Sequence, residues 1–352
     1  MIRIVQHFEA KSVKKAQPIN LLEGNTLKTA IREVVNANAN VAVPSIRKKT
    51  LWKQIVNSRT LLFMCLPAIA YFIVFCYIPM PGAYIAFTNF NYQAGIFGSQ
   101  FVGFKNFEFL IQSGKLWMLT RNTILYNFAF IIFGNAIQVL VAVLLSEVGS
   151  RKFKKLSQSA MFLPYFISAV MVGLIAFNIL NYDYGFLNTV MKLFGADPVK
   201  AYSTPEVWPF IILIVHLWQN TGYGSVVYFA TICGIDQSIV EAAQIDGTNT
   251  LQRIRYITLP SLKSTVVILF LFALGGIMKG NFGLFYNLVG SSNSNLFPYT
   301  DIIETFVYRA LMNQFNFSYS AAVGLYQSIF GFIIVIISNW LVRKFDSESS
   351  LF

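Results

Sequence analysis

Six apolar runs dominate this 352-residue chain and restrict what it can fold into. Each is near the roughly 20 residues that an α-helix needs to cross a bilayer core. The runs cover residues 61–87, 122–148, 158–180, 207–232, 265–288 and 319–342. Because 55% of the residues are hydrophobic and only 12% are charged, the composition excludes a water-soluble globule. We therefore predict an all-α integral membrane protein with six transmembrane helices in one domain, 59–345.

Proline and glycine predict where these helices depart from a straight rod. Three prolines in the first run, Pro67, Pro79 and Pro81, indicate that the helix bends or ends before residue 87, and Pro164 predicts a kink in the third. In the fifth run, Gly280 and Gly283 predict that the helix ends there, before the run does. The runs contain no pair of interrupted helices in corresponding halves, which argues against a secondary transporter.

The loops that are rich in lysine and arginine alternate along the chain, and this pattern predicts the orientation. Basic residues gather between the second and third runs, between the fourth and fifth, and after the sixth: Arg151, Lys152, Lys154, Lys155, Arg253, Arg255, Lys263, Arg343 and Lys344. We therefore predict that both termini are cytoplasmic. The net charge of +12 then reflects membrane topology, not nucleic-acid binding. Residues 1–58 are predicted to be a basic cytoplasmic tail on anionic lipids, with a modest amphipathic helix at 21–35.

The polar loop 240–261, between the fourth and fifth runs, predicts a compact helix-turn-helix. Gly247 permits a backbone reversal, and a second helix follows with Leu251, Ile254 and Ile257 at helical spacing. Pro260 is expected to restart the chain into the next run. The topology above places this loop in the cytoplasm, where an apolar-faced knob would dock on a partner.

The residues of this loop closely resemble the coupling loop of permease subunits of binding-protein-dependent, type I ABC importers. The matching residues are Glu241, Ala242, Ala243, Gly247, Ile257, Leu259 and Pro260, with Asp246 beside them and Thr248 departing from the usual alanine. Further segments, 78–82, 162–168 and 301–305 among them, are similar to permeases of Gram-positive complex-carbohydrate importers.

The resemblance implies the type I importer permease fold and a transport function in the cell membrane. It also implies the partners: a second related permease, two ATPase subunits, an extracellular substrate-binding lipoprotein and an oligosaccharide. This chain lacks a Gly-x-x-x-x-Gly-Lys-Ser/Thr loop, so we expect it to be no enzyme and to hold no cofactor or metal. ATP and Mg²⁺ would be bound by the partner ATPases.

Polar side chains within the apolar runs predict the substrate pathway, because such groups cost energy in lipid unless they face protein, water or a ligand. The candidates lie on the fourth, fifth and sixth runs: His216, Gln219, Asn220, Tyr223, Lys279, Asn281, Tyr326 and Gln327. In the second run, Asn127, Asn135 and Gln138 are expected to join helices. The alternatives that stay open are an importer of a non-sugar solute and, with less support, a secondary transporter.

Overall fold

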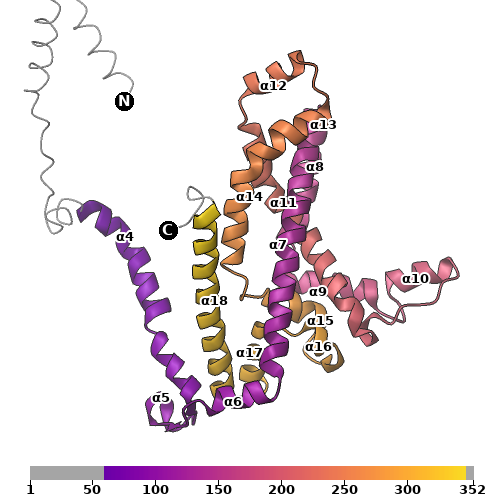
Figure 1. The fold of residues 1–352 in the computed structure, drawn as a ribbon. Helices are drawn as coiled ribbons and strands as arrows, with labels where there is room; N and C mark the ends of the chain where they lie inside the picture. The colour runs from indigo at the N-terminus through magenta and orange to yellow at the C-terminus, as the bar shows by residue number, and fades with distance from the viewer. Residues whose placement is uncertain (1–58, 346–352) are drawn as a thin grey trace, which may run out of the picture. The chain divides into compact units, whose positions relative to one another are not determined.

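The computed structural model describes residues 59–345, which are mainly helical (Figure 1). Residues 1–58, including the predicted amphipathic helix, and 346–352 lie outside the described residues. Contacts divide the chain into two units, Met1–Val74 and Phe75–Phe352, and the described part of the first contains α4 (Arg59–Phe72). The side chains of Leu61, Phe63 and Met64 on α4 are exposed, as expected for a helix that faces lipid.

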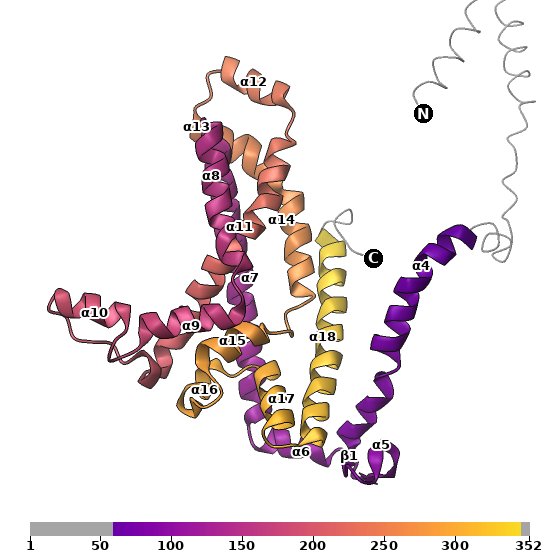
Figure 2. The same cartoon turned by 180° about the vertical axis from the view of Figure 1, so that it is seen from behind.

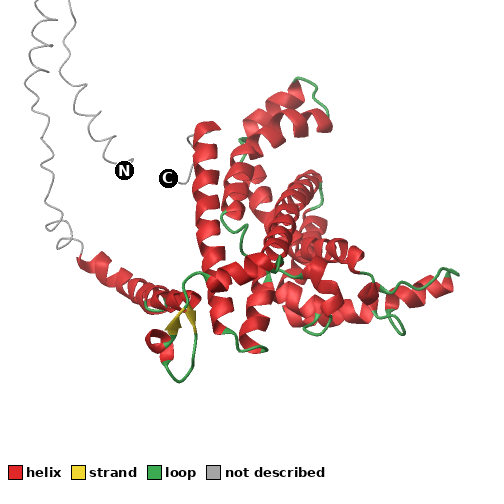
Figure 3. Ribbon diagram, turned by 60° about the horizontal axis from the view of Figure 1, so that its bottom comes forward, coloured by secondary structure: helices red, strands yellow, loops and turns green. Residues whose placement is uncertain are grey.

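Most of the described elements are helices, and their lengths differ widely. In chain order after α4 these are η2 (Ile73–Tyr77), η3 (Met80–Phe87), β1 (Thr88–Asn89), α5 (Gly95–Gly98), β2 (Gln100–Phe101), α6 (Lys105–Gln112), α7 (Lys115–Glu147), α8 (Arg151–Phe162), η4 (Leu163–Phe166), α9 (Ala169–Leu180), α10 (Phe186–Leu193), η5 (Ala201–Ser203), η6 (Pro205–Val207), α11 (Trp208–Cys233), α12 (Gln237–Ile245), α13 (Thr250–Arg253), η7 (Ile254–Thr258), α14 (Leu259–Leu274), α15 (Phe282–Val289), η8 (Ser294–Leu296), α16 (Phe297–Thr300), α17 (Ile303–Met312) and α18 (Phe317–Phe345). The two short strands pair antiparallel, with Thr88 opposite Phe101 (Figure 3).

Five helical stretches of the described chain are long and apolar enough to span a membrane, and a bent pair of helices makes a sixth. The straight stretches are Arg59–Phe87, Lys115–Glu147, Pro205–Cys233, Thr250–Leu274 and Phe317–Trp340. The bent pair joins Arg151–Phe166 to Ala169–Leu180 at an angle of 96°. This bend confirms the kink predicted at Pro164, which lies in the 3₁₀ turn η4 between the two helices.

The fifth span differs from the expected single helix over 265–288. Helix α14 ends at Leu274, residues 275–281 are not helical, and α15 begins at Phe282. The break comes earlier than Gly280 because the pair Gly275 and Gly276 lowers helix propensity first. Two spans are therefore interrupted, the third by a bend and the fifth by a break.

Three buried apolar clusters hold the second unit together, and each joins helices that are distant in the sequence. The first joins α7, α9, α11 and α15 through Phe130, Val172, Ile212 and Phe285. The second joins α6, α7, α17 and α18 to the break in the fifth span. The third joins α7, α11 and α14 through Ala142, Val143, Tyr228 and Leu262. Close van der Waals packing of these side chains favours association of the helices within the bilayer, where removal of apolar surface from water contributes little.

The predicted cytoplasmic loops of the second unit gather at one end of it. The α12–α13 region and the start of α8 lie at this end, and the C-terminal end of α18 points in the same direction. Helices α6, α16 and α17 lie at the opposite end (Figures 1 and 2). An ion pair between Arg253 of α13 and Glu147 of α7 also joins two of these loop regions directly. The arrangement is consistent with the predicted topology, in which this end faces the cytoplasm.

We expect a membrane-impermeant thiol reagent to label whole cells at position 294 and not at position 152. Both Ser294 and Lys152 are exposed in the structure, so accessibility of the side chain itself does not limit labelling. The variants Ser294→Cys and Lys152→Cys are each made after Cys65, Cys76 and Cys233 have been replaced by serine. Labelling of both positions in permeabilised cells is the control, and the reverse pattern in whole cells would invert the topology.

Candidate functional site

The loop between the fourth and fifth spans forms two short helices that meet at a tight turn. Asp236 begins α12, because its carboxylate accepts a hydrogen bond from the Ser238 backbone N–H at 2.9 Å. That hydrogen bond lowers the pKa of the Asp236 carboxyl. On the other side of the turn, Asn249 and Gln252 bond each other's backbone N–H groups at 2.9 Å. Both helices are thus fixed by their own residues before any partner binds.

The turn itself depends on Gly247, whose φ of +76° lies in the left-handed region. The Gly247 N–H donates to the Gln244 carbonyl at 3.1 Å, and the Thr248 N–H donates to the Ala243 carbonyl at 3.0 Å. These two bonds are those of a Schellman motif. The Thr248 hydroxyl adds a third, to the Ala243 carbonyl at 2.7 Å. Threonine at this position therefore reinforces the turn, which gives the departure from the usual alanine a structural role.

The outer surface of the loop carries large apolar side chains and an acidic one. Ile245 is 86% exposed and Leu251 is 73% exposed, and Ile239 and Glu241 are also exposed. The sequence predicted an apolar face made of Leu251, Ile254 and Ile257, and of these three residues only Leu251 is exposed. Ile254 packs against the third apolar cluster and Ile257 is half-buried, so these two residues attach the loop to the spans instead of forming its outer face.

The other residues that the sequence singled out are distributed over both sides of the loop. Ala243 is buried, in keeping with its role as acceptor in the turn, whereas Ala242 and Asp246 are exposed. Leu259 and Pro260 are exposed at the start of α14. Exposed apolar side chains grouped in this way are typical of a surface that contacts another protein or a membrane.

The loop continues into the fifth span without interruption, contrary to the expected restart at Pro260. The π-helical turn η7 (Ile254–Thr258) joins α13 to α14, and Pro260 lies in the first turn of α14. The wider π-helical turn precedes a residue that lacks a backbone N–H, where a regular α-helix would be disrupted. As a result, α13, η7 and α14 form one continuous helical stretch, Thr250–Leu274.

Side chains from the second and fourth spans attach this continuous stretch to the rest of the unit. Arg253 forms an ion pair with Glu147 at the end of α7, and the two side chains are 22% and 25% exposed. The Thr231 and Thr265 hydroxyls lie 3.2 Å apart, joining α11 to α14. The sequence did not single out Glu147, because an acidic residue at a helix end carries no sign of a partner 106 positions away.

The break in the fifth span is held by polar side chains of three other helices. The Asn127 amide of α7 donates to the carbonyls of Ile277 and Lys279, both at 3.0 Å. The Gln327 amide of α18 donates to the Met278 carbonyl at 2.6 Å. The Glu304 carboxylate of α17 accepts from the Gly280 N–H at 2.6 Å. Unwound backbone in a membrane requires such partners, so the expected role of Asn127 in joining helices is confirmed, with the break as its target.

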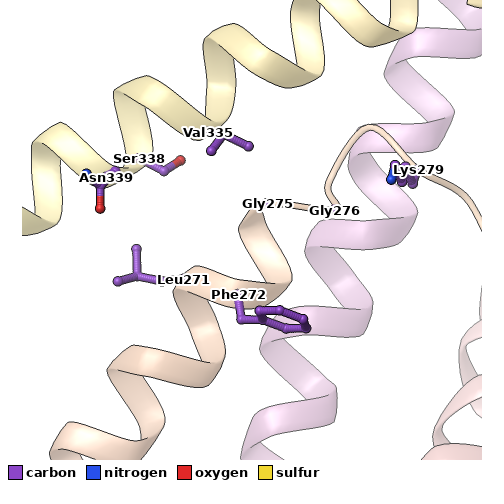
Figure 4. Close-up of a pocket in the computed structure, with 8 residues that line it drawn as sticks. All are labelled: Leu271, Phe272, Gly275, Gly276, Lys279, Val335, Ser338 and Asn339. Carbon is purple, nitrogen blue, oxygen red and sulfur yellow. The ribbon is translucent and has the colours of Figure 1, made fainter. Parts of the chain in front are cut away.

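Two cavities lie between this break and α18. One of about 340 Å³ is lined by residues that include Leu271, Phe272, Lys279, Ser338 and Asn339, with Lys279 beside the loop in Figure 4. The second, of about 550 Å³, is lined by Lys279, Glu304, Gln327, Ser328 and Phe332, among others. Lys279 and Gln327, both predicted pathway residues, thus face the same cavity.

The predicted polar face of the fourth span has its partners on the third span and on α7, instead of on the fifth and sixth spans. Gln219 donates to the Ile167 carbonyl at 3.0 Å, and the Tyr223 ring stacks on Tyr165 at 4.3 Å, so both face the third span. The His216 ring stacks on Phe130 of α7 at 3.7 Å. Asn220 donates to the His216 carbonyl one turn earlier.

Two further candidates have local partners. Asn281 begins α15, because its side chain accepts from the Leu284 N–H at 3.1 Å. The Tyr326 hydroxyl lies 3.0 Å from that of Thr120 on α7. The structure therefore brings Lys279 and Gln327 together at one cavity, while the fourth-span residues, Asn281 and Tyr326 lie at separate contacts.

Comparisons with known proteins cover nearly the whole chain. Residues 138–347 match the family described as "binding-protein-dependent transport system inner membrane component". The polygalacturonan/rhamnogalacturonan transport system permease protein YteP of Bacillus subtilis (strain 168) is 33% identical over 323 residues, 92% of this chain and 99% of that protein. The arabinooligosaccharides transport system permease protein AraP of the same organism is 26% identical, over 87% of this chain and 96% of that protein.

The fold also matches a solved structure, that of a bacterial ABC transporter involved in the import of the acidic polysaccharide alginate. The TM-score is 0.76 at 29% sequence identity, and the match covers 84% of this chain and 99% of that one. A second structure, of the alginate transporter in complex with an alginate pentasaccharide-bound periplasmic protein, matches with a TM-score of 0.74 at 30% identity, over 84% of this chain and 98% of that one.

Proposed function

The chain belongs to the family of binding-protein-dependent transport system inner membrane components, and from this membership we propose that it is one of two permeases in an ATP-driven oligosaccharide importer. The observation that carries the proposal is the exposed α12–α13 loop. This loop is stabilised by its own capping bonds, presents Ile245 and Leu251 outward, and continues without a break into the fifth span. A membrane-spanning helix that begins in a docking surface can transmit motion between the two.

The partner at this surface is a separate ATPase subunit, with two such subunits in the complete complex. Ile239, Ile245 and Leu251 supply an apolar surface for a groove, and the exposed Glu241 carboxylate pairs with a basic residue of the ATPase. ATP and Mg²⁺ bind to the ATPase subunits, and the permease itself carries out no chemical step. A second related permease completes the pathway across the membrane.

The solute is an oligosaccharide delivered by an extracellular binding protein. Support comes from the relatives, which are described as transporting polygalacturonan or rhamnogalacturonan, arabinooligosaccharides and alginate. The cavity beside the break adds chemical support, because Gln327 and Ser328 offer hydrogen bonds and Phe332 offers an aromatic ring. A peptide, polyamine or phosphate importer is less well supported, since none of these features favours such solutes over sugars.

Transport proceeds by alternating access. Closure of the ATPase dimer upon ATP binding displaces the α12–α13 loop, and the continuous stretch Thr250–Leu274 carries the displacement to the break at 275–281. The ion pair between Arg253 and Glu147 carries it to α7 at the same time. Because Asn127 of α7 also holds the break, both routes end at the cavity-lining segment. ATP hydrolysis then returns the spans to the inward-facing state.

The test is reconstitution of the complete complex, with both permeases and both ATPase subunits, in proteoliposomes. We expect the loaded binding protein to stimulate ATP hydrolysis and labelled oligosaccharide to accumulate only when ATP is present. Accumulation driven by a proton or sodium gradient in the absence of the ATPase subunits would instead identify a secondary transporter. Accumulation of peptides or polyamines, and not of oligosaccharides, would refute the sugar assignment.

A further inference from the structure

Lys279 is the only lysine or arginine within the six apolar runs of the sequence. The other charged residue in these runs is Glu147, which lies at the end of the second run and pairs with Arg253. A cation inside a membrane span is costly, and such residues usually face a cavity or a substrate pathway. We therefore expect the Lys279 ammonium group to pair with an acidic group, either of the protein or of a ligand.

The structure holds the backbone of Lys279 firmly while leaving its side chain exposed. The Lys279 N–H donates to the Gly276 carbonyl at 2.7 Å, and its carbonyl accepts from the Asn127 amide at 3.0 Å. The side chain lines both cavities beside the break, the one of about 340 Å³ and the one of about 550 Å³. A fixed backbone with an exposed ammonium group is the arrangement of a binding residue, because its position is set before the ligand arrives.

The carboxylate that lines the larger cavity with Lys279 does not pair with it. One oxygen of Glu304 accepts from the Gly280 N–H and from the Gln327 amide at 2.7 Å, and the other is buried without a hydrogen bond. Between residues 59 and 345, the recorded ion pairs are Arg253 with Glu147 and Arg309 with Asp301. The Lys279 ammonium thus has no acidic partner among the described residues, and Glu304 is committed to holding the break.

We propose that Lys279 recognises a carboxylate of the transported molecule, and hence that the solute is an anionic oligosaccharide containing uronic acid residues. This inference rests on the proposed function and names the class of sugar that the same pathway takes. An ammonium group attracts a carboxylate more strongly in a protein-lined cavity than in water, because the local dielectric is lower. Both N–H groups of Gln327 are committed to the Met278 carbonyl and Glu304, which leaves its side-chain carbonyl oxygen to accept from a sugar hydroxyl. The exposed rings of Phe272 and Phe332 provide apolar faces for the sugar itself.

The experiment compares an oligogalacturonide with its methyl-esterified form of equal length, in which each carboxylate loses its charge and gains one methyl group. Each is presented with the binding protein at saturating sugar, and uptake is measured in proteoliposomes that contain the complete complex. We expect Lys279→Met to lower uptake of the acid by about tenfold and uptake of the ester by less than about twofold. Lys279→Arg keeps the charge and should retain most of the acid uptake.

Lys263→Met is the matched control, because Lys263 is an exposed lysine on α14 of the same span and lines neither of the two cavities. It should change uptake of neither sugar. Equal loss of both sugars in Lys279→Met, or no loss of either, would overturn the role of Lys279, since a lysine that only extends toward the headgroups confers no selectivity. Uptake of the ester alone by the wild-type complex would refute the anionic solute and leave the importer function standing, whereas uptake of no sugar would refute the proposed function.

Discussion

Replacing Gly247 by proline is expected to lower solute uptake by roughly 100-fold while the permease remains in the membrane. Gly247 has a φ of +76°, whereas proline is restricted to negative φ near −65°. Proline would also remove the N–H that donates to the Gln244 carbonyl. The combined cost is about 3 kcal/mol or more, which corresponds to about two factors of ten in the population of the correctly folded turn. Uptake and binding-protein-stimulated ATP hydrolysis are measured together in reconstituted complexes.

A graded series of variants separates the turn from general damage to the loop. Asn adopts the left-handed conformation more readily than other residues with a Cβ, so Gly247→Asn should retain most of the uptake, with Gly247→Ala between Asn and Pro. Gly149→Ala is the control at the same end of the unit, since no atom lies near the position of its added Cβ and its φ is not in the left-handed region. Wild-type uptake in Gly247→Pro would show that the turn geometry is irrelevant to coupling.

Reversing the charge of either Glu147 or Arg253 is expected to lower uptake by about 5- to 30-fold. The pair is only about a quarter exposed, so loss of the attraction and the resulting repulsion cost about 1 to 2 kcal/mol in attachment of the loop to α7. We expect the single variants Glu147→Arg and Arg253→Glu to assemble and to retain basal ATP hydrolysis. Their defect should appear as fewer sugar molecules transported per ATP hydrolysed, because the loop then moves without α7.

The double variant Glu147→Arg with Arg253→Glu restores opposite charges and should recover most of the wild-type ratio of transport to hydrolysis. Arg151→Glu is the control, because Arg151 is an exposed basic residue at the same end of the unit. A double variant as impaired as either single one would contradict the role of this ion pair. The ratio of transport to hydrolysis is the informative measurement, since a purely destabilised complex would lose both activities together.

Local sequence patterns predicted those parts of the molecule that depend on neighbouring residues. The reversal at Gly247 follows from the conformational freedom of glycine, and the bend at Pro164 follows from the missing backbone N–H. The fifth span shows the limit of such patterns. Its hydrophobicity predicted one helix, but the break is stable only because Asn127, Gln327 and Glu304 bond its backbone groups. These partners lie on three other helices, so the sequence around the break does not predict them.

The candidate site divides in the same way. Polarity within an apolar run identified Lys279 and Gln327, and the structure brings them to one cavity. The same criterion selected Gln219 and Tyr223, whose contacts are with the third span. Helical spacing placed Ile254 on the outer face of the loop, whereas packing against α7 and α11 turns it inward. The spacing of residues along a helix shows which of them share a face. Which helix that face contacts depends on how the neighbouring helices pack.

Patterns of neighbouring residues are enough to establish the class of protein, the apolar runs, the turn at Gly247 and the family. These properties arise from the composition and order of residues close together in the chain, since hydrophobic length, glycine at positive φ and helix capping act over a few positions. Packing of the helices in three dimensions sets where the fifth span breaks, which side chains bond to the break, and that Arg253 pairs with Glu147. Those features are contacts between residues tens to hundreds of positions apart, and they exist only once the helices have packed against one another.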